Sequence, residues 1–138
     1  MQNHRYTLPG RDYIDPAIFT LERENIFFKS WFYAGRAEQV EASGQWFTID
    51  VVGESVIVMR NDVGELQAFY NVCRHRGSKL CDDAAGHSHG AIVCPYHNWC
   101  YSHQGALIAT PRIEEDELDR SLLSLWPVHV DVWQGFVF

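Results

Sequence analysis

Two short segments of the chain each carry one cysteine and one histidine: Cys73-Arg74-His75 and Cys94-Pro95-Tyr96-His97. Two cysteines and two histidines can hold zinc, but a zinc finger usually places both cysteines on one knuckle and both histidines on one helix. Here each segment supplies one thiolate and one imidazole. This order favours a two-iron, two-sulfide site, with Cys73 and Cys94 on one iron and His75 and His97 on the other.

A 2Fe–2S centre with two histidines on one iron is a Rieske cluster. Neutral imidazole replaces anionic thiolate there, so the oxidised cluster is less negative and easier to reduce than that of a plant-type ferredoxin. An exposed imidazole also offers a path for electrons. Zinc and a purely structural set of residues remain as alternatives, and iron and acid-labile sulfide analysis separates them.

The residues beside these segments predict how the site is built. A glycine and a proline permit or limit tight backbone turns around the sulfides, and Tyr101 is near enough to donate to a cluster sulfur. Trp99 stands where a hydroxyl residue would be a further donor, which favours the lower part of the Rieske potential range. The supporting residues are Arg76, Gly77, Pro95, Tyr96, Trp99 and Tyr101.

The remaining cysteines and histidines are interpreted as ordinary residues. Cys81 and Cys100 are expected to be small buried apolar side chains. A lone histidine without a matched partner is expected at the surface; these are His4, His87, His89, His103 and His129.

A helix is predicted over residues 15–30, with Asp15 as its N-cap and Pro16 in the first helical position. Trp31 begins a region rich in strands. Three strands are predicted at 46–50, 55–60 and 66–71, and the turn at 61–64 has Gly64 where a positive φ is needed. The third strand ends just before Cys73.

The second half of the chain is predicted as short strands and turns. Residues 82–90 are polar and contain glycine, which is typical of a surface loop, and 91–93 is a short strand that leads into Cys94. A hairpin joins 99–101 to 106–109, the acidic run 114–117 is solvated, and the alternation at 128–132 predicts a strand face. Residues 135–138 are apolar. An antiparallel β-sandwich or barrel with one N-terminal helix is the expected class.

The bulk properties exclude some functions. A length of 138 residues is that of one domain. The net charge of −7, from 18 acids and 11 bases, argues against nucleic acid as a partner, because its phosphates need Lys and Arg. No apolar run approaches the roughly 20 residues of a membrane span, and the polar N-terminus has no signal core. A cytoplasmic protein without a membrane partner is expected.

The sequence resembles the N-terminal Rieske domain of the α subunit of Rieske non-haem iron oxygenases, the aromatic-ring-hydroxylating dioxygenases and their monooxygenase relatives. The matching residues are Asp15-Pro16, Phe19, Glu22, Glu24, Ile26-Phe27, Ser30-Trp31, Arg60, Gly64-Glu65-Leu66, Ala68 to Gly77, Cys94 to His97, Trp99, Tyr101, Gly105, Leu107, Pro111, Gly135-Phe136 and Phe138. Asn98, where Gly or Ala is usual, and Cys100, where Thr is common, depart from the pattern.

The resemblance implies a Rieske domain over 41–138, with a cluster-binding subdomain at about 71–110, after a lead at 1–40. It implies that Cys73, His75, Cys94 and His97 hold the cluster and relay electrons from a reductase or ferredoxin that oxidised NADH or NADPH. The acceptor is a mononuclear Fe(II) in a catalytic domain, usually across a subunit boundary in a homotrimer. In the family the second histidine, here His97, faces an acidic residue that bridges to the neighbouring iron.

The catalytic domain, with its two histidines and one carboxylate, is absent from this sequence. The chain is therefore expected to be a fragment of an oxygenase, inactive on substrate by itself. Aromatic compound catabolism is the expected setting, with aromatic acids, arenes and quaternary amines all open as substrates. The alternatives are a stand-alone ferredoxin-type Rieske carrier and a zinc-binding interaction module.

Overall fold

The computed structural model describes residues 7–111, 113 and 118–138. It divides the chain into two compact units, residues 1–32 and 33–138, and each is treated by itself. The predicted acidic run at 114–117 and His4 lie outside the described residues. Across the described ranges, no helix has the length and apolar character needed to cross a membrane.

The first unit is helical. It contains the 3-10 turns η1 (Gly10–Tyr13) and η2 (Phe27–Lys29) and the helix α1 (Pro16–Asn25). The predicted start is confirmed, because the Asp15 side chain accepts a hydrogen bond from the Ala17 N–H at 2.9 Å and Pro16 opens the helix. The α-helix ends at Asn25 rather than at residue 30, since Asn and the β-branched Ile26 are weaker helix formers and the chain tightens into η2.

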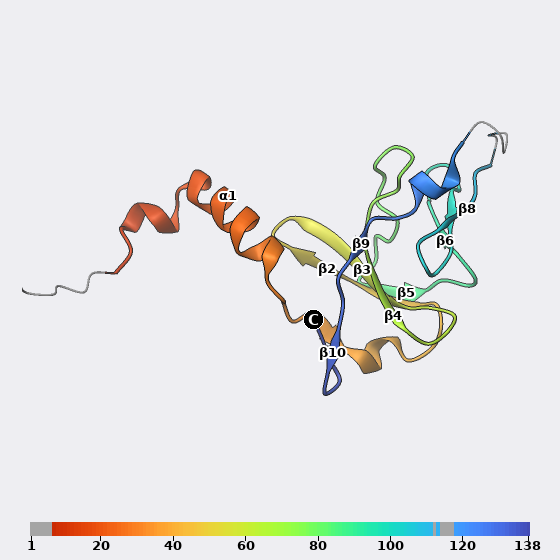
Figure 1. The fold of residues 1–138 in the computed structure, drawn as a ribbon, viewed down its shortest axis with the longest axis horizontal. Helices are drawn as coiled ribbons and strands as arrows, with labels where there is room; N and C mark the ends of the chain where they lie inside the picture. Colours follow the sequence, from red (N-terminus) through yellow and green to blue (C-terminus); the bar gives the residue numbers. More distant parts are fainter. Residues whose placement is uncertain (1–6, 112, 114–117) are drawn as a thin grey trace, which may run out of the picture. The chain divides into compact units, whose positions relative to one another are not determined.

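The second unit is a set of short antiparallel strands (Figure 1). Sheet A has the order β1-β11-β10, sheet B the order β5-β2-β3-β4-β9, and sheet C the order β6-β7-β8. The elements are β1 (Gly35–Arg36), η3 (Ala37–Val40), β2 (Gln45–Val51), β3 (Glu54–Arg60), β4 (Leu66–Tyr70), β5 (Ala85–His87), β6 (Ile92–Val93), β7 (Cys100–Tyr101), β8 (Leu107–Ala109), η5 (Arg120–Leu123), β9 (Pro127–Val128), β10 (Val132–Trp133) and β11 (Phe136–Val137). The predicted antiparallel class is confirmed, and none of these sheets closes into a barrel among the described residues.

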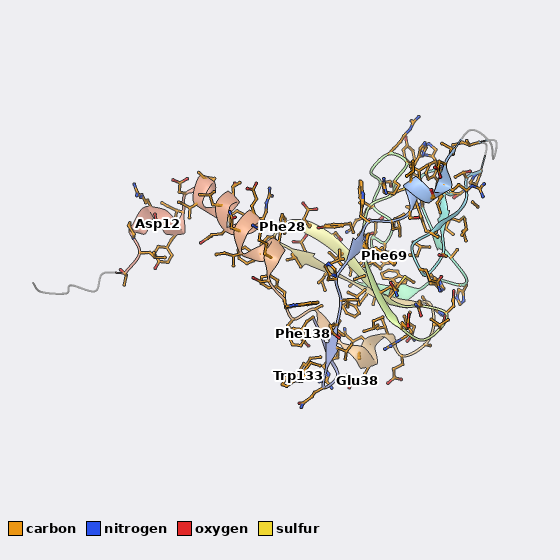
Figure 2. The ribbon with its side chains drawn as sticks, viewed as in Figure 1. Asp12, Phe28, Glu38, Phe69, Trp133 and Phe138 are labelled. Atoms are coloured by element: carbon orange, nitrogen blue, oxygen red, sulfur yellow. The ribbon has the colours of Figure 1, made fainter. Side chains whose placement is uncertain are left out.

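Sheet B is buried on both of its faces. Successive side chains of a strand point to opposite faces, so Val56 and Val58 of β3 enter one core cluster and Ile57 and Met59 enter the other. All four side chains are buried, which explains the uninterrupted apolar run in β3. Figure 2 shows Phe69 of β4 among crowded side chains, in the cluster that also contains both Cys–His cysteines.

Strand β5 lies inside the stretch predicted to be a surface loop. It pairs with β2, with Gly86 opposite Trp46. A Cβ on Gly86 would stand 2.5 Å from the Trp46 ring, so glycine is required for this close approach. The polar composition of 82–90 concealed the strand, because an edge strand exposed to solvent needs no apolar alternation.

The strand predicted at 128–132 is two strands in different sheets. β9 pairs with β4 in sheet B, and β10 pairs with β11 in sheet A. Between them Asp131 exchanges two backbone hydrogen bonds with Phe138, each 3.0 Å. The alternating valines indicate extended chain correctly, but they cannot show that this chain changes sheets.

Candidate metal centre

Two loops carry the Cys–His segments, and each follows a strand as predicted. The first loop (residues 71–81) leaves β4 of sheet B, and the second loop (residues 94–99) joins β6 to β7 of sheet C. Strands β6 and β7 pair Val93 with Cys100, so the second loop is closed at its base.

The buried side chain of Asn71 closes the first loop. Its amide donates to the Cys81 carbonyl at 2.7 Å and to the Ser55 hydroxyl at 3.1 Å. Its carbonyl oxygen accepts from the N–H groups of Leu80 and Cys81, at 3.0 and 2.9 Å. One side chain therefore ties the start of the loop to its end.

The second loop is held by its own backbone. The Cys94 N–H donates to the Trp99 carbonyl at 2.8 Å, and the Asn98 N–H donates to the Cys94 carbonyl at 3.0 Å. Asn98 has φ 58°, a left-handed conformation that asparagine tolerates better than most residues. The departure from Gly or Ala at this position thus keeps a residue that the turn accepts.

The loops bring the four predicted site residues together. The His75 and His97 rings have centroids 4.7 Å apart, at 72°, while Cys73 and Cys94 are only 2% and 1% exposed. Trp99 stacks on His75 at 4.6 Å, with 12° between the planes. The two histidine rings are thus paired with each other and the two cysteines are both buried, as expected of a site with cysteines on one iron and histidines on the other.

The Tyr101 hydroxyl lies where the sequence predicted a donor to sulfur. It is 3.2 Å from Cys73 Sγ, and it accepts the Arg74 N–H at 3.1 Å. Because the hydroxyl oxygen already accepts from Arg74, its own proton is available to Sγ. Burial, followed by the bond to Cys73, raises the pKa of Tyr101 above its ordinary value, so the phenol keeps this proton.

Burial dominates the electrostatics of the site. Burial raises the pKa of the Cys73 thiol, and neighbouring Cys94 adds to the rise, so a thiolate there calls for a cation beside it. Burial, then His97 and Arg76, lower the pKa of His75 and favour the neutral imidazole that metals bind. His97 Nδ1 is buried with no hydrogen-bond partner in the described part of the chain. An orphaned ring nitrogen at this place fits an iron ligand.

Each iron of a Rieske cluster takes two protein ligands, so pairs are the relevant units here. No group of three or more His, Cys, Asp or Glu residues is arranged to hold one metal ion, as far as the described residues go. The other predicted supporting residues surround the pairs: Arg76 and Pro95 are exposed, Tyr96 is 60% exposed against the His97 ring at 3.7 Å, and Gly77 has φ 72°.

One histidine contradicts its prediction. His103 is not a surface residue: it is 1% exposed, and its Nδ1 lies 2.7 Å from Asp62 Oδ1. This bond, followed by one from the Ser43 hydroxyl, lowers the pKa of Asp62. Its position in a turn suggested exposure, and no sequence signal marks Asp62, 41 residues away, as the partner.

The other predictions for isolated residues hold in the described ranges except for Cys100, which was predicted to be buried and is not fully so. His87, His89 and His129 are exposed. Cys81 is buried, and burial raises the pKa of its thiol to about 12; Cys100 is only half-buried. The sequence prediction missed Asn71 and Arg74 as site residues, although both lie within the matching stretch from Ala68 to Gly77. It missed them because their side-chain partners are other segments of the chain, which a local motif does not show.

Comparison with known proteins gives consistent matches. Residues 30–129 match the Rieske 2Fe-2S domain family. The glycine betaine monooxygenase oxygenase subunit of Chromohalobacter salexigens is 38% identical over 133 residues, which cover 96% of this chain and 30% of that relative. The chain spans about a third of the length of the curated relatives it matches.

Solved structures share the fold of this chain, and the chain again spans about a third of their length. The apo form of the quaternary ammonium Rieske monooxygenase CntA superposes with a TM-score of 0.87 at 33% identity, over 95% of this chain and 38% of that one. A naphthalene 1,2-dioxygenase mutant bound to phenanthrene has a TM-score of 0.85 at 32% identity, over 91% of this chain and 29% of that one.

Proposed function

Because this chain belongs to the Rieske 2Fe-2S domain family, we propose that it is the electron-transfer domain of a Rieske oxygenase. It receives electrons from a reductase or ferredoxin and passes them to a mononuclear iron in a catalytic domain. The observation that carries the proposal is the paired arrangement of the two loops. The His75 and His97 rings lie 4.7 Å apart, and His97 Nδ1 is buried and unpartnered within the described structure.

In this proposal Cys73 and Cys94 hold one iron of the cluster, and His75 and His97 hold the other. The bound cluster supplies one-electron acceptance and donation. The side chains around it have defined tasks. Tyr101 donates its proton towards the Cys73 sulfur and stabilises added negative charge. Trp99 fixes the plane of the His75 ring by stacking, and His75 and His97 are both half-buried, so the histidine side of the site lies towards solvent.

The proposed substrate class of the whole oxygenase is quaternary ammonium compounds, which replaces the expectation of aromatic compound catabolism. Support comes from relatives named as glycine betaine monooxygenase and quaternary ammonium monooxygenase. The similarity to naphthalene 1,2-dioxygenase supports the shared electron-transfer domain rather than a shared substrate. NADH or NADPH supplies the electrons through the reductase, and the assembly is a homotrimer in the cytoplasm.

The test begins with the purified chain reconstituted with iron and sulfide. We expect a coloured protein with two irons and two sulfides and, after reduction by dithionite, the EPR signal of a Rieske centre. His97→Ala should lose that signal, because one iron loses a ligand. A colourless protein with stoichiometric zinc would contradict the cluster, and an unchanged EPR signal in the variant would contradict His97 as a ligand.

A second measurement tests the place of the domain in the reaction. The reduced chain, given oxygen and glycine betaine, should form no oxidised product, because substrate chemistry belongs to the catalytic domain. An electron donor partner should reduce the cluster in a concentration-dependent way. Substrate turnover by the chain alone would contradict the proposed division of labour.

A further inference from the structure

Arg74 lies between Cys73 and His75, and both its backbone N–H and its guanidinium donate hydrogen bonds. Its backbone N–H donates to the Tyr101 hydroxyl at 3.1 Å. Its guanidinium donates to the Ser124 carbonyl at 2.6 Å and to the Leu122 carbonyl at 3.2 Å. The same group stacks on the Trp126 ring at 4.0 Å. A side chain between two proposed ligands is therefore attached to a segment about 50 residues further on.

That segment, residues 122–126, is itself fixed to the rest of the second unit. The Trp126 carbonyl accepts the Tyr70 N–H at 3.0 Å, at the end of β4 where the first loop begins. The Leu125 N–H donates to the Gly105 carbonyl at 2.8 Å, in the turn that follows β7. The Leu125 side chain is 3% exposed, in the core cluster that contains Cys73 and Cys94. Segment 122–126 thus contacts the end of β4, where the first loop begins, and the turn after β7, the strand that follows the second loop.

We infer that Arg74 is a positioning residue for the cluster, and that segment 122–126 holds it in place through two carbonyl groups and the Trp126 ring. The inference rests on the proposed function. A guanidinium keeps its charge at all working pH values, and its planar fork suits two carbonyl acceptors. Carried by the residue that follows Cys73 and fixed on segment 122–126, this charge favours the extra electron of the reduced cluster. Its backbone N–H also sets the direction in which the Tyr101 hydroxyl donates.

The test uses the full chain with its cluster and two readouts, the midpoint reduction potential and the EPR line widths. Arg74→Gln removes the charge and should lower the potential. Arg74→Lys keeps the charge but loses the fork and most of the stacking, so broadened EPR lines and a smaller fall in potential are expected. Trp126→Leu should broaden the EPR lines in the same way. Trp126→Phe, which keeps an aromatic ring under the guanidinium, should have the line widths of the wild type.

Lys79→Gln is the matched control. Lys79 is an exposed cation of the same loop, so its removal should leave the line widths as in the wild type and move the potential less than Arg74→Gln does. Equal shifts in these two variants would overturn the inference, because Arg74 would then act only as a surface charge.

Wild-type potential and line widths in both Arg74→Lys and Trp126→Leu would also overturn it. If Arg74→Gln does not take up the cluster, these two variants decide alone. A wild-type chain without a Rieske signal overturns the proposed function and this inference with it. A normal wild-type signal with unresponsive variants overturns only the role of Arg74.

Discussion

The first loop and the second loop supply the same pair of residue types and close with the same backbone pattern, in which the cysteine N–H donates to the carbonyl five residues on, at 2.7 Å for Cys73 and 2.8 Å for Cys94. They differ because the first loop is also tied to distant segments by side chains. The first loop spans residues 71–81 and adds side-chain hydrogen bonds to those of its backbone, chiefly from the Asn71 amide and the Arg74 guanidinium. The second loop spans 94–99 and depends on two hydrogen bonds within its own backbone. A long loop must lose more conformational freedom than a short turn does, so it needs contacts from outside itself.

Asn71 offers the largest test of this difference. Asn71→Ala removes the hydrogen bonds of a buried amide and leaves Leu80 N–H and Cys81 N–H without a partner. We expect a loss of about 3 kcal/mol in the free energy of unfolding and poor retention of iron. Urea unfolding and iron content measure the two effects.

Asn61→Ala is the control for that experiment. Asn61 is equally buried, and its side chain accepts from the N–H groups of Val63 and Glu65 in the turn before β4, outside both loops. It should lose stability but retain iron in the folded fraction. Equal loss of iron in both variants would show that Asn71 supports the fold in general and not the first loop.

Tyr101→Phe comes next, because it should change both the stability and the reduction potential, and it acts through the first loop. It removes the hydroxyl between Cys73 Sγ and the Arg74 N–H, at a cost of about 1 kcal/mol in stability. The reduction potential should fall, because a donor to sulfur is lost. Voltammetry of the reconstituted protein measures it, and an unchanged potential would mean that the hydroxyl does not donate to the cluster.

Asn98 gives an effect on stability alone, and it should appear only through the second loop. Asn98→Val places a β-branched residue at φ 58° and should cost about 1–2 kcal/mol. Asn98→Gly should be neutral within about 0.5 kcal/mol. Thermal unfolding separates the two variants. If both are equally stable, the backbone of this turn is not what holds the second loop.

The Asp62–His103 pair lies outside both loops and gives the smallest effect. His103 lowers the pKa of Asp62, so the carboxylate stabilises the fold above its unfolded pKa, and this contribution is lost as the pH falls through the folded value. Asp62→Asn should therefore lose less stability than the wild type between about pH 5 and pH 3. Urea unfolding midpoints measured at each pH check this. Asn71→Ala should lose the same share of its iron in the Asp62→Asn background as in the wild-type background. A different share would link the Asp62–His103 pair to the first loop.

The sequence predicted the chemistry of the site better than its support. The Cys–His order and the strands that lead into both loops follow from local patterns. Strand β5 and the burial of His103 do not, because Gly86 pairs with Trp46 and His103 with Asp62 across 40 residues or more. The same limit concealed Arg74, whose guanidinium partners lie at 122 and 124. A local pattern cannot specify a distant partner.

The pairing of β1 with β11 has a consequence for synthesis of the protein. Gly35 stands opposite Val137, and Arg36 opposite Phe136, so sheet A joins residues about a hundred positions apart. Contacts of such long range form slowly, because a large loop must close first. On the ribosome, both Cys–His loops emerge well before the strand that completes sheet A. The nascent chain therefore presents its thiols and imidazoles before sheet A can close.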